Sequence, residues 1–218
     1  MPTVACASSC ANGTKGAIVM FAEVLRQGIS DAVSFALWDP RAVREAMATG
    51  VGSDITLSLG GKTPMAALNE ASHPVAVSGH VKLAFDGRYK NRGPMSARVL
   101  ADLGPTVVID TGAVVISFDQ EPFDLNCLSS VGVDPRQKRF ILLKSRIHWR
   151  AGFGDLADEV IECQGLGVTT SDYSKLKFSK VRRPIYPLDG AFDRQRERDG
   201  TGLRDPNTST SPMRSTPH

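Results

Sequence analysis

Hydrophobic residues in the first sixty positions follow helical and strand spacings in turn. Apolar positions three, four and seven residues apart predict a helix over residues 18–27, ended by a glycine. Residues 32–37 form a short apolar run, which is typical of a strand buried on both faces. Asp39-Pro40 then supplies an N-cap and a first-turn proline for a helix that ends near Gly50. Residues 55–59 alternate between apolar and polar side chains and predict a second strand.

The middle of the chain changes to the two-residue alternation of antiparallel strands. Residues 75–85 predict one long strand with its large apolar side chains on a single face, and Asp86-Gly87 predicts a hairpin after it. A second hairpin is predicted across Thr111-Gly112. The remaining pattern predicts, in order, a short helix at 123–130, a strand at 140–143, a helix at 149–158 and a strand at 160–163. The fold class is therefore α/β, with flanking helices and a mixed sheet that is parallel at one end and antiparallel in the middle.

Composition places the chain among ordinary globular proteins. Hydrophobic residues make up 41% and charged residues 22% of its 218 positions, which excludes disorder throughout. No stretch approaches the roughly 20 uncharged apolar residues of a membrane-spanning helix. The N-terminus also lacks the basic start and unbroken apolar run of a secretory signal. We therefore expect a cytoplasmic protein with no membrane partner.

Positive charge is concentrated near the C-terminus. Positions 175–218 hold ten Lys or Arg against five Asp or Glu, whereas the remaining 174 positions hold sixteen against eighteen. The basic and acidic residues of the last stretch alternate, which is typical of a solvated chain rather than a nucleic-acid-binding stripe, so no nucleic-acid partner is expected. Because residues 191–218 contain few large apolar side chains, we expect a disordered tail there. The expected division is an altered N-terminal segment at 1–14, an α/β domain at 15–190 and this tail.

The four cysteines do not form a recognisable framework. Three residues separate Cys6 from Cys10, a pair that offers at most half of a zinc site, while Cys127 and Cys163 stand alone. The four histidines are scattered, and none has a His or carboxylate partner at ligand spacing. We therefore expect buried or idle thiols and no metal bound by this chain.

Polar clusters follow directly on predicted strands, where ligand sites of α/β sheets usually lie. Leu59-Gly60-Gly61-Lys62 could approach an anion, but it lacks the spacing of a phosphate-binding loop, and a strand-ending turn is the better interpretation. In the segment from Asn91 to Met95, Arg92 could bind a carboxylate, the alternative being a rigid surface turn.

The densest cluster lies between Lys144 and Arg150. Three cations, Lys144, Arg146 and Arg150, surround His148 after a four-residue apolar strand. Cations at the end of a buried strand favour binding of an anion or carboxylate, and His148 could donate a proton there. Packing of His148 beneath the sheet is the alternative. Farther along, a proline-stiffened segment could return Arg183 to the same site or seal a sheet edge.

Asp110-Thr111-Gly112 has the letters of a retroviral-type aspartic protease motif. That chemistry needs two carboxylates that share a proton, so a single copy would require a homodimer. A hairpin turn explains the same residues and agrees with the surrounding α/β pattern.

Taken together and in order, five motifs resemble the C-terminal domain of the microcystinase C (MlrC) family over about residues 15–189. They are Trp38-Asp39-Pro40, Leu59-Gly60-Gly61-Lys62, Asn91-Arg92-Gly93-Pro94-Met95, Lys144-Ser145-Arg146-Ile147-His148-Trp149-Arg150 and Arg183-Pro184-Ile185-Tyr186-Pro187-Leu188-Asp189. The resemblance implies a zinc-dependent metallopeptidase family with two domains, whose zinc ligands lie in the N-terminal one. By this resemblance the present chain corresponds to the second domain.

The sequence departs from the family pattern at two places. Residues 5–13 replace an acidic, glycine-rich loop, and residues 118–120 lack an arginine expected before Pro122-Phe123-Asp124. Three hypotheses follow: a peptide- or carboxylate-binding part of a zinc hydrolase, a non-catalytic binding module or remnant, and a dimeric aspartic protease. The first expects a separate MlrC N-terminal domain as partner, His148 as catalytic residue, and Asn91, Arg92, Lys144, Arg146, Arg150 and Arg183 as substrate-binding residues. Catalysis by the chain alone and formation of a homo-oligomer are left open.

Overall fold

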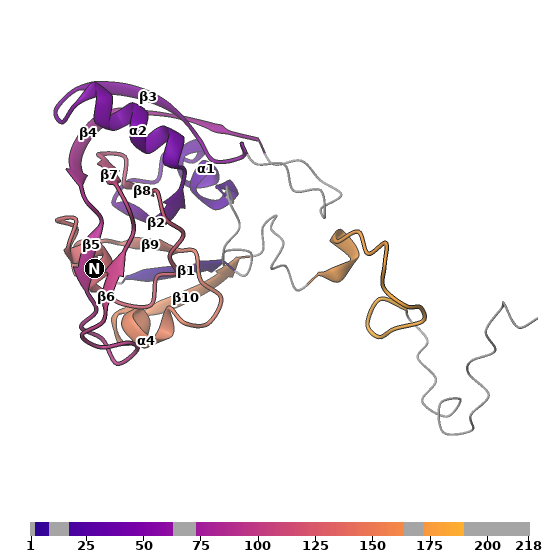
Figure 1. The fold of residues 1–218 in the computed structure, drawn as a ribbon. Coiled ribbons are helices and arrows are strands. Elements are labelled where there is room, and N and C mark those ends of the chain that lie inside the picture. The colour runs from indigo at the N-terminus through magenta and orange to yellow at the C-terminus, as the bar shows by residue number, and fades with distance from the viewer. Residues whose placement is uncertain (1–2, 9–17, 63–72, 164–171, 190–218) are drawn as a thin grey trace, which may run out of the picture. The chain divides into compact units, whose positions relative to one another are not determined.

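A mixed sheet with helices on both faces forms the first of two units in the chain (Figure 1). The computed structural model describes residues 3–8, 18–62, 73–163 and 172–189, and it divides the chain into units Met1–Lys177 and Phe178–His218. The predicted tail at 191–218 lies outside the described residues. The expected α/β class is confirmed for the first unit.

The described strands of the main sheet lie in the order β10-β1-β9-β2-β8-β7-β4-β3. The five strands from β10 to β8 are parallel, and β7, β4 and β3 continue the sheet in antiparallel pairing. Their bounds are β1 (Val4–Ser8), β2 (Ala32–Trp38), β3 (Asp54–Leu59), β4 (Val75–Phe85), β7 (Thr106–Ile109), β8 (Ala113–Ile116), β9 (Phe140–Leu143) and β10 (Glu159–Cys163). A separate ribbon pairs β5 (Arg88–Lys90) with β6 (Leu100–Asp102).

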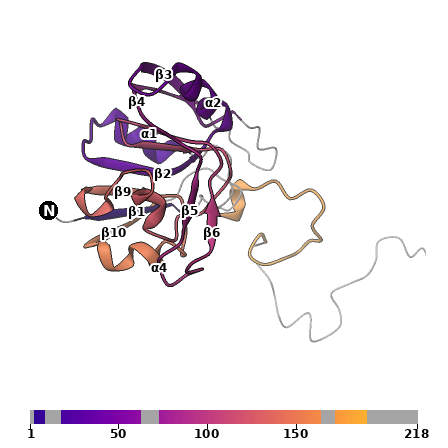
Figure 2. The ribbon, with the colours of Figure 1, turned by 60° about the vertical axis from the view of Figure 1, so that its left-hand side comes forward.

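Two apolar clusters, one on each face of the sheet, hold the layers together. On one face α1 (Val19–Arg26) and α2 (Pro40–Thr49) pack against the sheet, and on the other lie α3 (Asn126–Ser129), α4 (Arg150–Phe153) and the β5–β6 ribbon. Figure 2 shows the helices α1 and α2 on one side of the sheet and α4 on the other. Strand β1 shows the alternation that this requires, because Val4 and Cys6 join the first cluster while Ala5 and Ala7 join the second. Short 3₁₀ turns are found at Pro135–Gln137, Gly154–Leu156 and Tyr173–Lys175.

The start of α2 follows the predicted capping chemistry. Asp39 Oδ1 accepts the backbone N–H of Ala42 at 3.0 Å, and Pro40 occupies the first turn, where its missing N–H costs nothing. The predicted helix at 18–27, the Thr111-Gly112 hairpin and the strand at 140–143 are likewise confirmed. The helix predicted at 149–158 is shorter, because α4 ends at Phe153 and passes into a 3₁₀ turn.

Two expectations about the long strand β4 are wrong. Asp86-Gly87 does not close a hairpin, since β5 leaves the main sheet and pairs with β6. The apolar residues of β4 also do not share one face. The pairing with β7 shifts between Val81 and Leu83, so Val77 and Val81 pack in one cluster while Leu83 and Phe85 pack against the other. An extra residue of this kind reverses the side-chain direction of everything after it.

Candidate functional site

The segment Lys144-Ser145-Arg146-Ile147-His148-Trp149-Arg150 leaves the sheet at the carboxyl end of β9. This strand lies between β1 and β2, with Leu143 opposite both Ala7 and Phe35. The backbone N–H of Lys144 extends the pairing by one bond, to the carbonyl of Phe35 at 3.1 Å. The segment therefore begins at the edge where the parallel strands end, which is where α/β sheets usually bind ligands.

Lys144 is the buried cation of this edge. The residue is only 7% exposed, although lysines are seldom buried to this extent. Burial lowers the pKa of its ammonium from 10.5 to about 8, and the negative charge of Asp119 partly offsets this effect. Lys144 therefore carries a charge at neutral pH that is lost more readily than that of a surface lysine.

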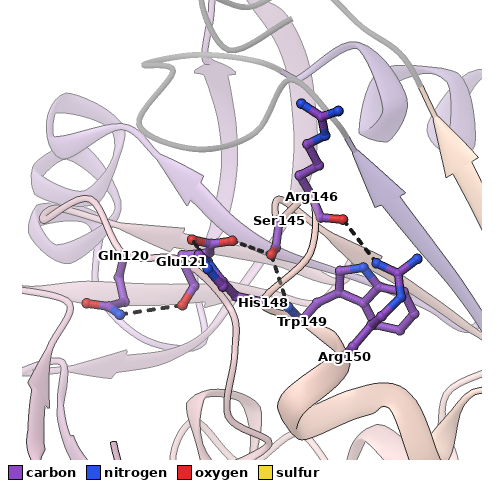
Figure 3. A network of polar contacts seen from close by, with 7 residues as sticks. All are labelled: Gln120, Glu121, Ser145, Arg146, His148, Trp149 and Arg150. Atoms are coloured by element: carbon purple, nitrogen blue, oxygen red, sulfur yellow. Dashed lines mark hydrogen bonds and ion pairs between the residues drawn. The ribbon is translucent and has the colours of Figure 1, made fainter. Parts of the chain in front are cut away.

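Glu121 joins the side chains that follow Lys144 (Figure 3). The buried hydroxyl of Ser145 donates a hydrogen bond to Glu121 Oε1, and Nδ1 of His148 lies 2.8 Å from Oε2. Ser145 Oγ in turn accepts the backbone N–H of Trp149 at 3.1 Å, which fixes the turn into α4. Both carboxylate oxygens of Glu121 are thus used to hold this segment.

Asp124 holds the loop that contains Asn91 and Arg92 in place. This carboxylate is 1% exposed and accepts three backbone N–H groups, those of Arg92 at 2.7 Å, Gly93 at 2.6 Å and Asn126 at 2.8 Å. Three N–H donors on one carboxylate satisfy a buried charge without a cation.

The backbone between Glu121 and Asp124 also touches α4. A Cβ added at Gly152 would lie 2.6 Å from the carbonyl oxygen of Phe123 and 2.9 Å from Cα of Asp124, so only glycine permits this approach. Residues 121–124 therefore bring the Asn91–Arg92 loop and the Lys144–Arg150 segment to the same part of the fold.

The predicted substrate-binding arginines differ in what their guanidinium groups contact. Arg92 and Arg146 are exposed, and no described carboxylate lies within ion-pair distance of either. Figure 3 shows the Arg146 side chain extending away from the Glu121 contacts. Arg150 instead bonds to Glu162 at 2.8 Å and lies over the ring of Trp149 at 4.9 Å. Of the three, Arg92 and Arg146 are therefore the better suited to bind an added anion.

Asn91 and Arg183 have local surroundings of different kinds. Asn91 is 3% exposed, and no described group hydrogen-bonds its side-chain Oδ1. Arg183 belongs to the second unit, where its Nε donates to Asp189 Oδ2 at 2.7 Å. That guanidinium and the N–H of Ile185 lower the pKa of Asp189. Substrate binding by either residue stays a prediction.

Two other motifs have structural roles. Asp39 Oδ2 accepts the N–H of Gly60 at 3.1 Å and the ammonium of Lys62 at 2.7 Å, so the Gly60-Gly61-Lys62 segment forms the strand-ending turn that the sequence favoured. Asp110 begins the β7–β8 hairpin turn and accepts the N–H of His80 at 2.9 Å. Gly112 in that turn has a φ of +88°, and a Cβ there would lie 2.1 Å from the carbonyl oxygen of Ala32. The hairpin interpretation of Asp110-Thr111-Gly112 is confirmed.

The model of the MlrC C-terminus family matches residues 10–180, which is most of the chain. The chain belongs to the MlrC C-terminal domain family. Over 158 residues it is 30% identical to microcystinase C of Sphingomonas sp., an alignment that covers 70% of this chain and 28% of that protein. A crystal structure from Mesorhizobium sp. BNC1, provisionally described as a metallopeptidase, superposes with a TM-score of 0.77 at 22% identity and covers 88% of this chain and 39% of that one. The chain thus spans well under half the length of either relative.

The described side chains of this MlrC C-terminal domain can be examined for possible metal ligands. Within residues 3–8, 18–62, 73–163 and 172–189, no group of three or more His, Cys, Asp or Glu side chains is arranged to hold a metal ion. Cys6 is buried, and burial with nearby Cys163 and Glu159 raises the pKa of its thiol to about 11, whereas Cys10 lies outside the described residues. The described residues therefore do not fit the zinc that the resemblance implies. No described helix is long and apolar enough to cross a membrane.

Three residues of the site escaped sequence reasoning: Glu121, Asp124 and Ser145. Glu121 is 24 residues from Ser145 and 27 from His148 in the sequence, so no local spacing links them. Pro122-Phe123-Asp124 was recognised as a family motif, but its role as an acceptor of backbone N–H groups was not predicted. The visible signal was two carboxylates within four residues in a stretch without regular structure.

Proposed function

We propose that this chain is the substrate-binding domain of an MlrC-type zinc peptidase and binds a carboxylate of a peptide at the carboxyl edge of its sheet. The zinc would be held by a separate N-terminal domain of the same family type. The observation that carries the proposal is Lys144, a cation 7% exposed at the end of a central parallel strand. Burying an ammonium costs folding free energy, and the need to neutralise the carboxylate of a ligand would explain why the fold retains it.

The roles of the cations follow from their surroundings. Lys144 offers a desolvated charge, so its attraction to a carboxylate is stronger than at the surface. Arg146 is exposed and two residues farther on, and Arg92 is exposed on the loop that Asp124 fixes, so both guanidinium groups can donate to the same ligand or to its peptide groups. His148 is the group of this segment whose ring nitrogens can accept and donate a proton.

No step of the proposal runs through a metal held by the described residues, since they do not fit one. This chain contributes binding, orientation and proton transfer to the substrate. Zinc, when bound by the partner domain, would supply Lewis-acid activation of the hydrolytic water. A cytoplasmic location and self-association remain predictions.

The test combines the full chain with a separately produced MlrC-type N-terminal domain and zinc, and follows cleavage of a linear peptide. We expect cleavage only when both proteins are present, and Lys144→Met to raise KM about 10- to 100-fold, the value of one charge-assisted hydrogen bond. Arg41→Gln is the control, because Arg41 is exposed on α2 and has no role in the proposal. Peptide binding with no cleavage would favour a non-catalytic binding module, and absence of both would refute the proposal.

A further inference from the structure

We propose that Glu121 is a positioning residue that fixes His148 in the Nδ1–H tautomer, so that Nε2 is the atom that accepts a proton from the attacking water. This inference rests on the proposed function for its catalytic meaning. Its structural content concerns the present chain alone. Three hydrogen bonds determine the tautomer, and the donor and acceptor of each can be assigned in turn.

The first two bonds fix the proton of Ser145. The backbone N–H of Trp149 can only donate, and it donates to Ser145 Oγ at 3.1 Å. An ionised Glu121 can only accept, so the one hydroxyl proton of Ser145 is directed to Glu121 Oε1. Ser145 is fully buried and occupied on both sides. It therefore acts as a brace for Glu121 and not as a nucleophile.

The third bond fixes His148. Nδ1 lies 2.8 Å from Glu121 Oε2, and a contact between Nδ1 and an ionised carboxylate needs a hydrogen on Nδ1. A neutral His148 then has no hydrogen on Nε2. Unconstrained imidazole side chains favour the opposite tautomer, so Glu121 reverses an intrinsic preference.

The hydrogen bond from Ser145 keeps Glu121 in the orientation that contacts His148. Glu121 uses one oxygen for Ser145 and the other for His148, and its side chain is 18% exposed, so rotation would break a buried bond. The His148 side chain remains 41% exposed. Because Nδ1 already contacts Glu121, Nε2 is the ring nitrogen that can make a polar contact with a ligand.

With its hydrogen on Nδ1, His148 can accept one proton at Nε2 and later release the same proton. As the oxygen of the attacking water forms a bond to the carbonyl carbon of the scissile peptide, one O–H proton of that water passes to the Nε2 lone pair. Glu121 stays ionised and stabilises the imidazolium through the Nδ1–H bond. The carbon–nitrogen bond of the peptide then breaks with its electron pair going to nitrogen, and the proton passes from Nε2 to that amine nitrogen, which returns His148 to its starting state.

Nitrogen NMR of the full chain with labelled histidine tests the inference without any hydrolysis. At a pH where the ring is neutral, we expect His148 to show a protonated Nδ1, an unprotonated Nε2 and a far-downfield Nδ1–H proton. His148→Asn identifies the signal among the four histidines. A wild-type His148 with its hydrogen on Nε2 would overturn the proposal.

Two variants of Glu121 test the cause. Glu121→Ala is expected to move the hydrogen to Nε2. Glu121→Gln keeps the shape, and its weaker neutral acceptor is expected to shift the Nδ1–H proton upfield and speed its exchange. Glu162→Gln makes the same chemical change next to Arg150 without contact to His148, and should leave the spectrum unchanged. If Glu121→Ala does not fold, Glu121→Gln decides, and a wild-type spectrum in it would refute the assignment.

The catalytic meaning is tested in the reconstituted peptidase. Glu121→Gln is expected to lower kcat about 10- to 100-fold with little change in KM, since general acid–base catalysis contributes about that much or more. Lys144→Met should mainly raise KM. If reconstitution gives no cleavage, the proposed function fails while the NMR result still decides the tautomer. A Glu121→Gln enzyme with unchanged kcat would overturn the catalytic role.

Discussion

Replacing Lys144 by methionine should stabilise this protein while it weakens carboxylate binding. Burial lowers the pKa of Lys144 from 10.5 to about 8, so the folded chain holds the ammonium less well than the unfolded chain does. At about 1.36 kcal/mol per pKa unit, this amounts to a destabilisation of about 3 kcal/mol at neutral pH. Methionine has a similar length and no charge, and therefore removes this penalty.

The sign of the pH dependence makes the prediction specific. Below pH 8 both states bind the lysine proton and the penalty is complete. As pH rises from about 8 to 10.5, the folded chain releases the proton first, so the wild type gains stability relative to the variant. The advantage of Lys144→Met should therefore shrink toward zero near pH 10.5.

Urea unfolding of both proteins at pH 7 and pH 10.5 provides the assay. Lys82→Met is the matched control, because Lys82 is exposed on β4 and should show no pH-dependent difference. A Lys144→Met protein less stable than the wild type at pH 7 would refute the reasoning. So would a stability difference that is the same at both pH values.

The other contacts give three further predictions. Gly152→Ala should destabilise the protein by about 1–3 kcal/mol, because the added Cβ would lie 2.6 Å from the Phe123 carbonyl oxygen. Gly154→Ala is the control and should be tolerated, because its Cβ would lie 3.9 Å from the nearest neighbouring atom. Thermal melts of the two variants provide the comparison. Asp124→Ala should speed hydrogen exchange in residues 91–99, since it removes the carboxylate that accepts the N–H groups of Arg92 and Gly93; unchanged exchange would contradict this role. Asp39→Ala should cost at least about 1 kcal/mol in chemical unfolding, because it removes the α2 cap and the Lys62 partner, and a neutral result would contradict that.

The sequence was informative wherever a local pattern determines an element. The apolar spacing of α1, the Asp39-Pro40 start of α2 and the Thr111-Gly112 turn each depend on residues within a few positions of one another. Strand β1 was not predicted, because Val-Ala-Cys-Ala-Ser has no strong apolar alternation and depends on pairing with β9 and β10. The reversal of faces in β4 was hidden for a similar reason, since the shift exists only in its pairing with β7.

The site was predicted in its cations and missed in its carboxylates. The cationic cluster could be found in the sequence because it directly follows an apolar strand; its residues are Lys144, Arg146 and His148. Glu121 bonds to residues more than twenty positions away, and Asp124 to a loop about thirty positions earlier, so only the fold brings them together. The sequence thus indicated which groups could bind a ligand but not which groups hold them in place.

The most direct test of the account is a pair of binding titrations with one linear peptide, as its free acid and as its C-terminal amide. At pH 7 we predict that the acid binds about 10- to 100-fold more tightly, and that Lys144→Met removes most of the difference. The advantage of the acid should also fall as pH rises through about 8, where Lys144 loses its charge. Equal dissociation constants for the two peptides at pH 7 would contradict carboxylate recognition at this edge of the sheet.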